Sequence, residues 1–119
     1  MSKIILFAQQ KGGAGKTMLL TQVAAAMAGK GKAVALVDLD PQRSACEWFE
    51  TRMAKRGSGD GISLIESANW RASSDIRKAA KAADLVFIDS PGTAEVLKRV
   101  ALKAADFCVV PCQPSAADV

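Results

Sequence analysis

The sequence predicts an α/β fold in three layers, with a mostly parallel sheet covered by helices on both faces. Two observations lead to this prediction: short apolar strands alternate with helical stretches along the chain, and those strands are nearly continuous apolar runs. Such runs are typical of parallel strands buried on both faces, whereas a strand half exposed to water alternates apolar and polar residues. At 119 residues the chain has the length of one domain, which we expect to span 1–119.

Each element has its own local signal. We expect strands at 4–7, 33–37, 85–88 and 107–110, with a shorter candidate at 62–65, and helices at 16–28, 44–55, 74–83 and 93–104. In the first helix, apolar residues recur at helical spacing, and Gly29 and Gly31 follow as stop signals. Ser73 or Ser74 is the expected N-cap of the third helix. Because the sequence ends just after its last strand, where an open sheet needs a covering helix, we expect the fold to be incomplete at the carboxyl end.

Composition excludes several classes of function. The absence of histidine rules out Ser-His-Asp hydrolases, Cys-His proteases and His-ligated zinc sites. The three cysteines form no C-x-x-C pair, so we expect reduced thiols in a cytoplasmic protein, with Cys108 and Cys112 as small buried apolar residues. We find no signal-peptide core and no apolar run long enough for a membrane span, so no membrane contact is expected. A net charge of +4 is compatible with an anionic partner and equally with a solvated surface.

The first chemical motif is the glycine-rich segment from Gln10 to Thr17, which follows a strand and opens a helix. Glycines allow the backbone to curl so that several N–H groups point at one anion, and the helix N-terminus adds its positive dipole end. Lys16 would reach the β- and γ-phosphates of a nucleotide, and the hydroxyl of Thr17 would bind Mg²⁺. The general phosphate-loop pattern has glycine where this chain has Gln10, and Lys11 is an additional lysine.

Two further motifs lie at strand ends. Asp38 and Asp40 end the second strand, and Asp89 ends the strand at 85–88, with Gly92 three residues later. Ligands bind at the carboxyl ends of strands in open parallel sheets, and carboxylates there serve Mg²⁺ and orient water. The backbone N–H of Gly92 would reach the γ-phosphate. The alternative for Asp38 and Asp40 is a strand-to-helix turn in which aspartate caps the helix and Pro41 breaks the strand.

Together these segments resemble the partition ATPases of the ParA type, within the deviant Walker, MinD-like branch of P-loop NTPases. The similarity covers the whole chain, and the segments have the order and spacing found in the family. They are Lys-Gly-Gly-Ala-Gly-Lys-Thr at 11–17, Val-Asp-Leu-Asp-Pro-Gln at 37–42, Asp-Ser-Pro-Gly at 89–92 and Val-Pro-Cys-Gln-Pro-Ser at 110–115. Members of the family continue well beyond the point that corresponds to Val119. Arg43 stands where the family often has glycine, and the sequence offers no role for it.

The resemblance implies ATP and Mg²⁺ as cofactors and a homodimer that forms on ATP binding. It implies that Lys11 crosses to the phosphates of the partner subunit, that Lys16 binds phosphates within its own subunit, and that Asp40 orients the attacking water. The implied metal residues are Thr17, Asp38 and Asp89. The implied nucleotide-binding residues are Gly12, Gly13, Ala14, Gly15, Lys16, Thr17 and Gly92, with Pro111 near the adenine.

The resemblance also implies a cycle in which a ParB-like partner stimulates hydrolysis and non-specific DNA is bound and released. Such a cycle positions plasmid DNA, chromosome DNA or a protein cargo, with nucleoid association inside a bacterial cell. The visible basic residues are those of ordinary solvated helix faces, so the DNA contact is a family expectation only. Two alternatives stay open: a fragment that binds nucleotide or a partner chain without turnover, and an ATPase of the MinD-like sister branch.

Overall fold

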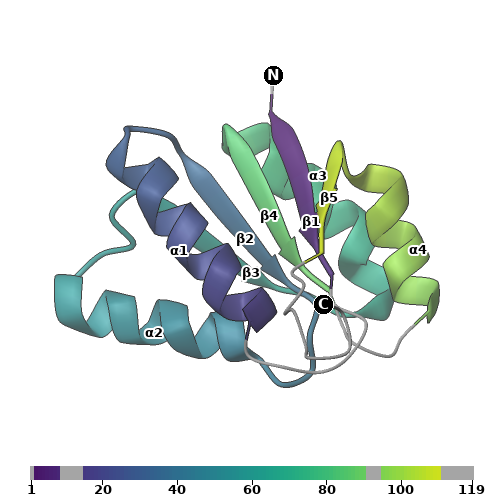
Figure 1. Ribbon diagram of the computed structural model, residues 1–119, viewed down its shortest axis with the longest axis horizontal. Coiled ribbons are helices and arrows are strands. Elements are labelled where there is room, and N and C mark those ends of the chain that lie inside the picture. Colours follow the sequence, from purple (N-terminus) through teal and green to yellow (C-terminus); the bar gives the residue numbers. More distant parts are fainter. Residues whose placement is uncertain (1, 9–14, 91–94, 111–119) are drawn as a thin grey trace, which may run out of the picture.

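The computed structural model describes residues 2–8, 15–90 and 95–110, and its centre is a five-stranded sheet in which every pair of neighbours is parallel (Figure 1). The strand order is β3-β2-β4-β1-β5. The strands are β1 (Lys3–Phe7), β2 (Val34–Asp38), β3 (Ile62–Glu66), β4 (Leu85–Asp89) and β5 (Phe107–Val109). Because β4 lies between β1 and β2, the carboxyl ends of three chemically important strands are neighbours.

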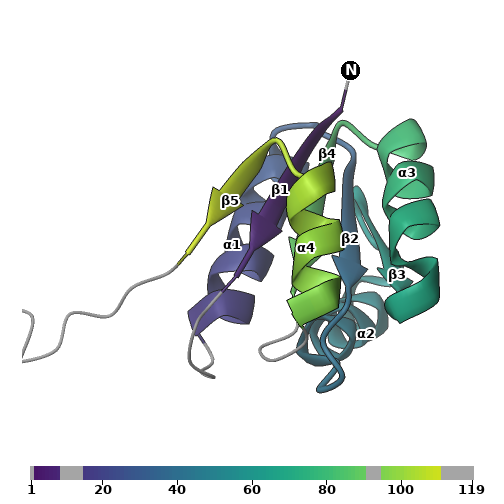
Figure 2. The ribbon, with the colours of Figure 1, turned by 90° about the vertical axis from the view of Figure 1, so that its right-hand side faces the viewer.

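Helices cover both faces of the sheet, which gives the three layers (Figure 2). One face packs against α1 (Gly15–Gly29) and α2 (Ser44–Arg56), and the other against α3 (Ala72–Ala82) and α4 (Glu95–Ala104). A 3₁₀ turn, η1 (Asn69–Arg71), precedes α3. The predicted α/β fold class is therefore confirmed, and none of the described helices is both long and apolar enough to span a bilayer.

Strand β2 shows why the strands read as continuous apolar runs. All five of its residues are buried, and successive side chains point to opposite faces. Val34 and Leu36 join the core under α1 and α2, whereas Ala35 and Val37 join the core under α3 and α4. The strand is apolar at every position except its last because neither face meets water.

Two local predictions are wrong. Helix α3 begins at Ala72, so neither Ser73 nor Ser74 is its N-cap; instead the hydroxyl of Ser74 donates to the carbonyl of Arg71 at 3.1 Å. Cys108 is exposed, because β5 lies at the edge of the sheet and pairs only with β1 among the described strands. Cys112 lies outside the described residues.

Candidate functional site

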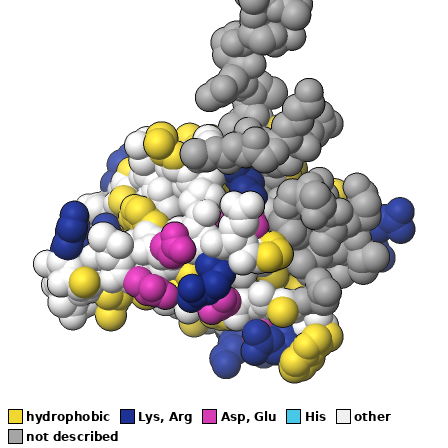
Figure 3. Space-filling view, turned by 90° about the horizontal axis from the view of Figure 1, so that it is seen from below, with side chains coloured by type: hydrophobic (Ala, Val, Ile, Leu, Met, Phe, Trp, Pro, Cys, Tyr) yellow, Lys and Arg dark blue, Asp and Glu magenta, His cyan; other side chains and the backbone are white. Residues whose placement is uncertain are grey.

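The sheet brings two predicted carboxylates together at one edge. In the register of the strands, Asp89 at the end of β4 is paired with Phe7 of β1 on one side and with Asp38 of β2 on the other. Both aspartates are 1% exposed. Seen from this edge, acidic and basic side chains lie side by side and do not form separate patches (Figure 3). Buried carboxylates this close together need hydrogen-bond donors or a positive charge.

Lys16 supplies the positive charge from the first turn of α1. Its ammonium lies 3.1 Å from Asp40 Oδ2 and 3.0 Å from Asp89 Oδ1, and it donates a hydrogen bond to the carbonyl of Ser90. The side chain is 6% exposed. Burial by itself would lower the pKa of Lys16, but the attraction of Asp89 and Asp40 outweighs it and raises that pKa, so the group is a cation.

Lys16 and Thr17, which are adjacent in the chain, both contact the carboxylate of Asp89. The hydroxyl of Thr17 donates to Asp89 Oδ2 at 3.1 Å. Oδ1 faces the charge of Lys16 but has no hydrogen bond of acceptable geometry among the described residues. Burial raises the pKa of Asp89 against the opposing effect of Lys16, and nearby Asp38 adds to the rise. Among the described residues, the charge of Lys16 is therefore what compensates Asp89 Oδ1.

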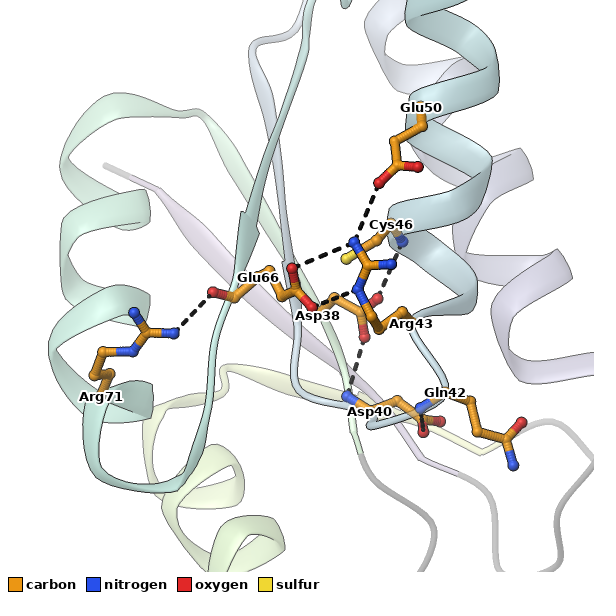
Figure 4. Close-up of polar contacts among 8 residues, drawn as sticks. All are labelled: Asp38, Asp40, Gln42, Arg43, Cys46, Glu50, Glu66 and Arg71. Atoms are coloured by element: carbon orange, nitrogen blue, oxygen red, sulfur yellow. Dashed lines mark hydrogen bonds and ion pairs between the residues drawn. The ribbon is translucent and has the colours of Figure 1, made fainter.

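Asp38 and Asp40 shape the turn between β2 and α2 (Figure 4). Asp38 Oδ1 accepts from the backbone N–H of Asp40, and its Oδ2 accepts from the backbone N–H of Cys46, each at 3.0 Å. Asp40 Oδ1 accepts from the N–H of Gln42 at 3.0 Å, which leaves Oδ2 directed at Lys16. Both carboxylate oxygens of Asp38 thus accept hydrogen bonds from the backbone, whereas one oxygen of Asp40 faces Lys16, the predicted phosphate-binding residue.

The structure shows a role for Arg43, whereas the sequence offered none. Its backbone is left-handed, with φ 58°, a conformation that glycine adopts without strain. Its guanidinium donates to Glu66 Oε2 at 2.5 Å and to Glu50 Oε1 at 3.1 Å, and so ties the turn to the end of β3 and to α2 (Figure 4). The bonds to Glu66, and then to Glu50, raise the pKa of the guanidinium. The signal that could have indicated this left-handed conformation is the glycine that the ParA-type family often has at this position.

Comparison with known proteins assigns the chain to a family. A model of the family described as ATPase MipZ matches residues 3–119. The chain belongs to this family. It is 34% identical over 119 residues to a maintenance of carboxysome distribution protein A from Gloeobacter kilaueensis, with 98% of this chain and 52% of that protein covered. It is 33% identical over 135 residues to the chromosome-partitioning ATPase Soj from Thermus thermophilus, with 92% and 54% covered.

The fold is also similar to that of a nucleotide-bound protein whose structure has been solved. Cobyrinic acid a,c-diamide synthase from Mycobacterium smegmatis, with bound ATP analog and magnesium, superimposes with a TM-score of 0.76 at 25% identity, covering 94% of this chain and 60% of that one. The chain spans about half the length of the curated relatives it matches. The resemblance to ParA-type ATPases is confirmed at the level of the MipZ/ParA-like family.

Only part of the predicted site of this MipZ-family chain falls within the described residues. Lys11, Gly12, Gly13, Ala14, Gly92 and Pro111 lie outside the described residues. Gly15 is the first residue of α1, and a Cβ added there would meet nothing within 4 Å. Of the predicted site, the structure therefore brings together five side chains: Lys16, Thr17, Asp38, Asp40 and Asp89.

The donor set at this edge fits magnesium. Mg²⁺ prefers hard oxygen ligands, keeps several waters, and is usually held by one or two carboxylates together with substrate phosphates. The Thr17 hydroxyl and the Asp89 carboxylate lie next to each other, and Asp89 Oδ1 is buried without a hydrogen-bond donor. Among the described residues, no three acidic, thiol or imidazole side chains form a cage that would hold a metal alone.

The left-handed backbone at Arg43 yields a prediction about stability. Arg43→Gly loses the ion pairs but relieves the backbone, whereas Arg43→Ala loses the same ion pairs and keeps a left-handed residue that costs about 1–2 kcal/mol relative to glycine. Glycine's greater freedom in the unfolded chain offsets part of this difference. In urea unfolding we expect the glycine variant to be the more stable of the two. Equal midpoints would contradict a left-handed conformation at this position.

Cys46 yields a prediction about pH. Burial, reinforced by the neighbouring Asp38 carboxylate, raises the pKa of its thiol from 9.0 to about 12. The folded state therefore keeps a proton that the unfolded state loses above pH 9, so this contribution to stability is complete below pH 9 and decreases as pH rises toward 12. We expect the wild type to lose on the order of 1 kcal/mol per pH unit in that range relative to Cys46→Ala. Cys108→Ala, which alters an exposed thiol, should follow the wild type; if it follows Cys46→Ala instead, Cys46 is not the group responsible.

Proposed function

We propose that this chain is the nucleotide-binding core of a ParA-type ATPase, which binds MgATP at the strand-end edge and hydrolyses it. The observation that carries the proposal is the cluster of Lys16, Thr17, Asp40 and Asp89, in which a lysine and a hydroxyl from the start of α1 meet carboxylates from two strand ends. This is the combination of groups that phosphoryl transfer requires: a cation for the phosphates, oxygens for Mg²⁺ and a carboxylate beside the reacting phosphate.

Each residue has a proposed task. Lys16 binds the β- and γ-phosphates, and Thr17 and Asp89 hold Mg²⁺, which when bound neutralises phosphate charge. Asp40 orients the attacking water, since its Oδ1 is held by the turn and its Oδ2 faces the ammonium of Lys16. Asp38 shapes that turn through the N–H groups of Asp40 and Cys46, so we assign it a positioning task beside the metal.

The residues outside the described ranges complete the proposed site. Gly12, Gly13, Ala14 and Gly15 would direct backbone N–H groups at the phosphates, Gly92 would reach the γ-phosphate, and Pro111 would lie near the adenine. Lys11 would cross to the nucleotide of a second copy, as an arginine finger does when supplied in trans. A homodimer that forms on ATP binding follows from this task of Lys11.

We further propose that the ATP cycle positions a cargo inside the bacterial cytoplasm. The support is family membership together with relatives named for chromosome partitioning and for carboxysome distribution. In such a cycle the ATP-bound dimer binds DNA non-specifically, and a ParB-like partner stimulates hydrolysis and release. The cargo would be plasmid or chromosome DNA, or a protein compartment.

Phosphate release and ATP binding, measured side by side, test the proposal. We expect Lys16→Ala to weaken ATP binding by about 10- to 100-fold, because charge-assisted hydrogen bonds contribute about 1.5–3 kcal/mol. Asp40→Ala should retain ATP binding and lower turnover by about 100-fold or more, as expected when a group that handles the attacking water is removed. Lys30→Ala, which alters an exposed lysine after α1, is the matched control and should match the wild type.

Two results would overturn the proposal in different ways. Wild-type protein that binds ATP without releasing phosphate would be a nucleotide-binding module and not an enzyme. Turnover unchanged in Lys16→Ala would remove the strand-end cluster from the reaction altogether.

A further inference from the structure

We propose that Lys16 is a mobile internal counterion: without nucleotide, its ammonium neutralises the carboxylates of Asp40 and Asp89 and keeps magnesium away from them until phosphates draw the ammonium out. This inference rests on the proposed function for the identity of the incoming ligand. Its physical basis, the arrangement of charges at the strand ends, is independent of turnover.

The first support is the set of oxygens around the lysine. Among the described residues, the ammonium donates hydrogen bonds to Asp40 Oδ2 and to the carbonyl of Ser90, and it forms an ion pair with Asp89 Oδ1. All three residues follow or end β2 or β4, so Lys16 joins α1 to both strand ends. At 6% exposure the side chain is as deeply placed as a core residue. An ammonium enclosed in this way leaves little room for a second cation at the same carboxylates.

The second support is the shared use of Asp89. Thr17 and Lys16 are adjacent in the chain and contact the two different oxygens of this carboxylate. If Lys16 withdraws, Asp89 Oδ1 loses its charge partner in a buried place, and it has no hydrogen-bond donor among the described residues to replace it. The uncompensated carboxylate then attracts a divalent cation strongly, because the surroundings are poorly solvated.

The third support is that backbone hydrogen bonds hold the turn that carries Asp40, whereas the lysine stem is flexible. Asp38 accepts two backbone hydrogen bonds and Asp40 accepts one, so the turn keeps its shape without the lysine. Lysine, in contrast, carries its charge on a flexible four-carbon stem. A triphosphate would offer the ammonium new anionic partners, so phosphate binding and metal binding should favour each other. Metal alone should bind poorly, as coupling between two ligands requires.

Divalent-cation binding in the absence of nucleotide tests the proposal. We would titrate the full chain with Mn²⁺, followed by electron paramagnetic resonance, and compare Lys16→Met, Lys30→Met and the wild type. Lys16→Met keeps an unbranched apolar side chain but removes the charge, and we expect it to bind Mn²⁺ about 10-fold more tightly than the wild type or more. Lys30→Met makes the same charge change at an exposed site and should bind like the wild type. If Lys16→Met binds Mn²⁺ no more tightly than Lys30→Met, the counterion role is wrong.

Amine labelling of the wild type keeps the proposal testable if Lys16→Met fails to fold. Without nucleotide, the enclosed ammonium of Lys16 should react with acetic anhydride at least about 10-fold more slowly than exposed Lys30, and Asp89→Asn should speed its labelling. Equal labelling of Lys16 and Lys30 in the wild type would overturn the proposal. Neither measurement uses ATP, so a failure here leaves the proposed ATPase standing. Absence of ATP binding would overturn the ATPase and the release of Lys16 by phosphates, but it would leave the counterion role without nucleotide standing.

Discussion

The ion pairs from the Lys16 ammonium to Asp40 and Asp89 are the interaction on which the strand-end edge depends. Parallel strands bring Asp38 and Asp89 into register at the carboxyl edge, where both are almost fully buried. Removing one partner of a buried ion pair typically costs about 3–5 kcal/mol, because the remaining charge is left uncompensated. The first turn of α1 must therefore place a cation over this edge. Under the proposed function, metal and phosphate together would take over this place of the cation.

The turn from β2 to α2 is the rigid part of this arrangement. Asp38 accepts hydrogen bonds from the N–H of Asp40 within this turn and from the N–H of Cys46 at the start of α2. Arg43 ties the outside of the same turn to Glu66 and Glu50 (Figure 4). These outer ion pairs are exposed and contribute little to stability, so their effect is to orient the turn. Asp40 is consequently presented at a defined position opposite Lys16, which is what a residue that orients water needs.

Much of the fold and of the strand-end site could be predicted from the sequence, because the sequence features that determine them are local motifs or periodic apolar patterns. The apolar runs of β2 and β4 indicated burial on both faces, and the aspartates that end them indicated a site at that edge. The spacing of residues along the sequence does not predict the contacts of individual side chains. Both oxygens of Asp38 accept hydrogen bonds from backbone N–H groups, and Lys16 pairs with two carboxylates. The left-handed backbone of Arg43 was missed because the residue itself gives no sign of it. Cys108 is exposed because β5 is the edge strand of the sheet that the described residues form, and strand order cannot be read from the apolar pattern alone.

The most direct test of the account is nuclear magnetic resonance of the lysine side-chain ammonium groups, recorded with and without Mg·ATP. Without nucleotide, the Lys16 resonance should show slow proton exchange and hydrogen-bond couplings to carboxylate carbons, in contrast to exposed lysines such as Lys30. Addition of Mg·ATP should shift the Lys16 resonance and replace those couplings with couplings to phosphorus. A Lys16 resonance that resembles those of exposed lysines and stays unchanged when Mg·ATP is added would contradict both the ion pairs and the phosphate site.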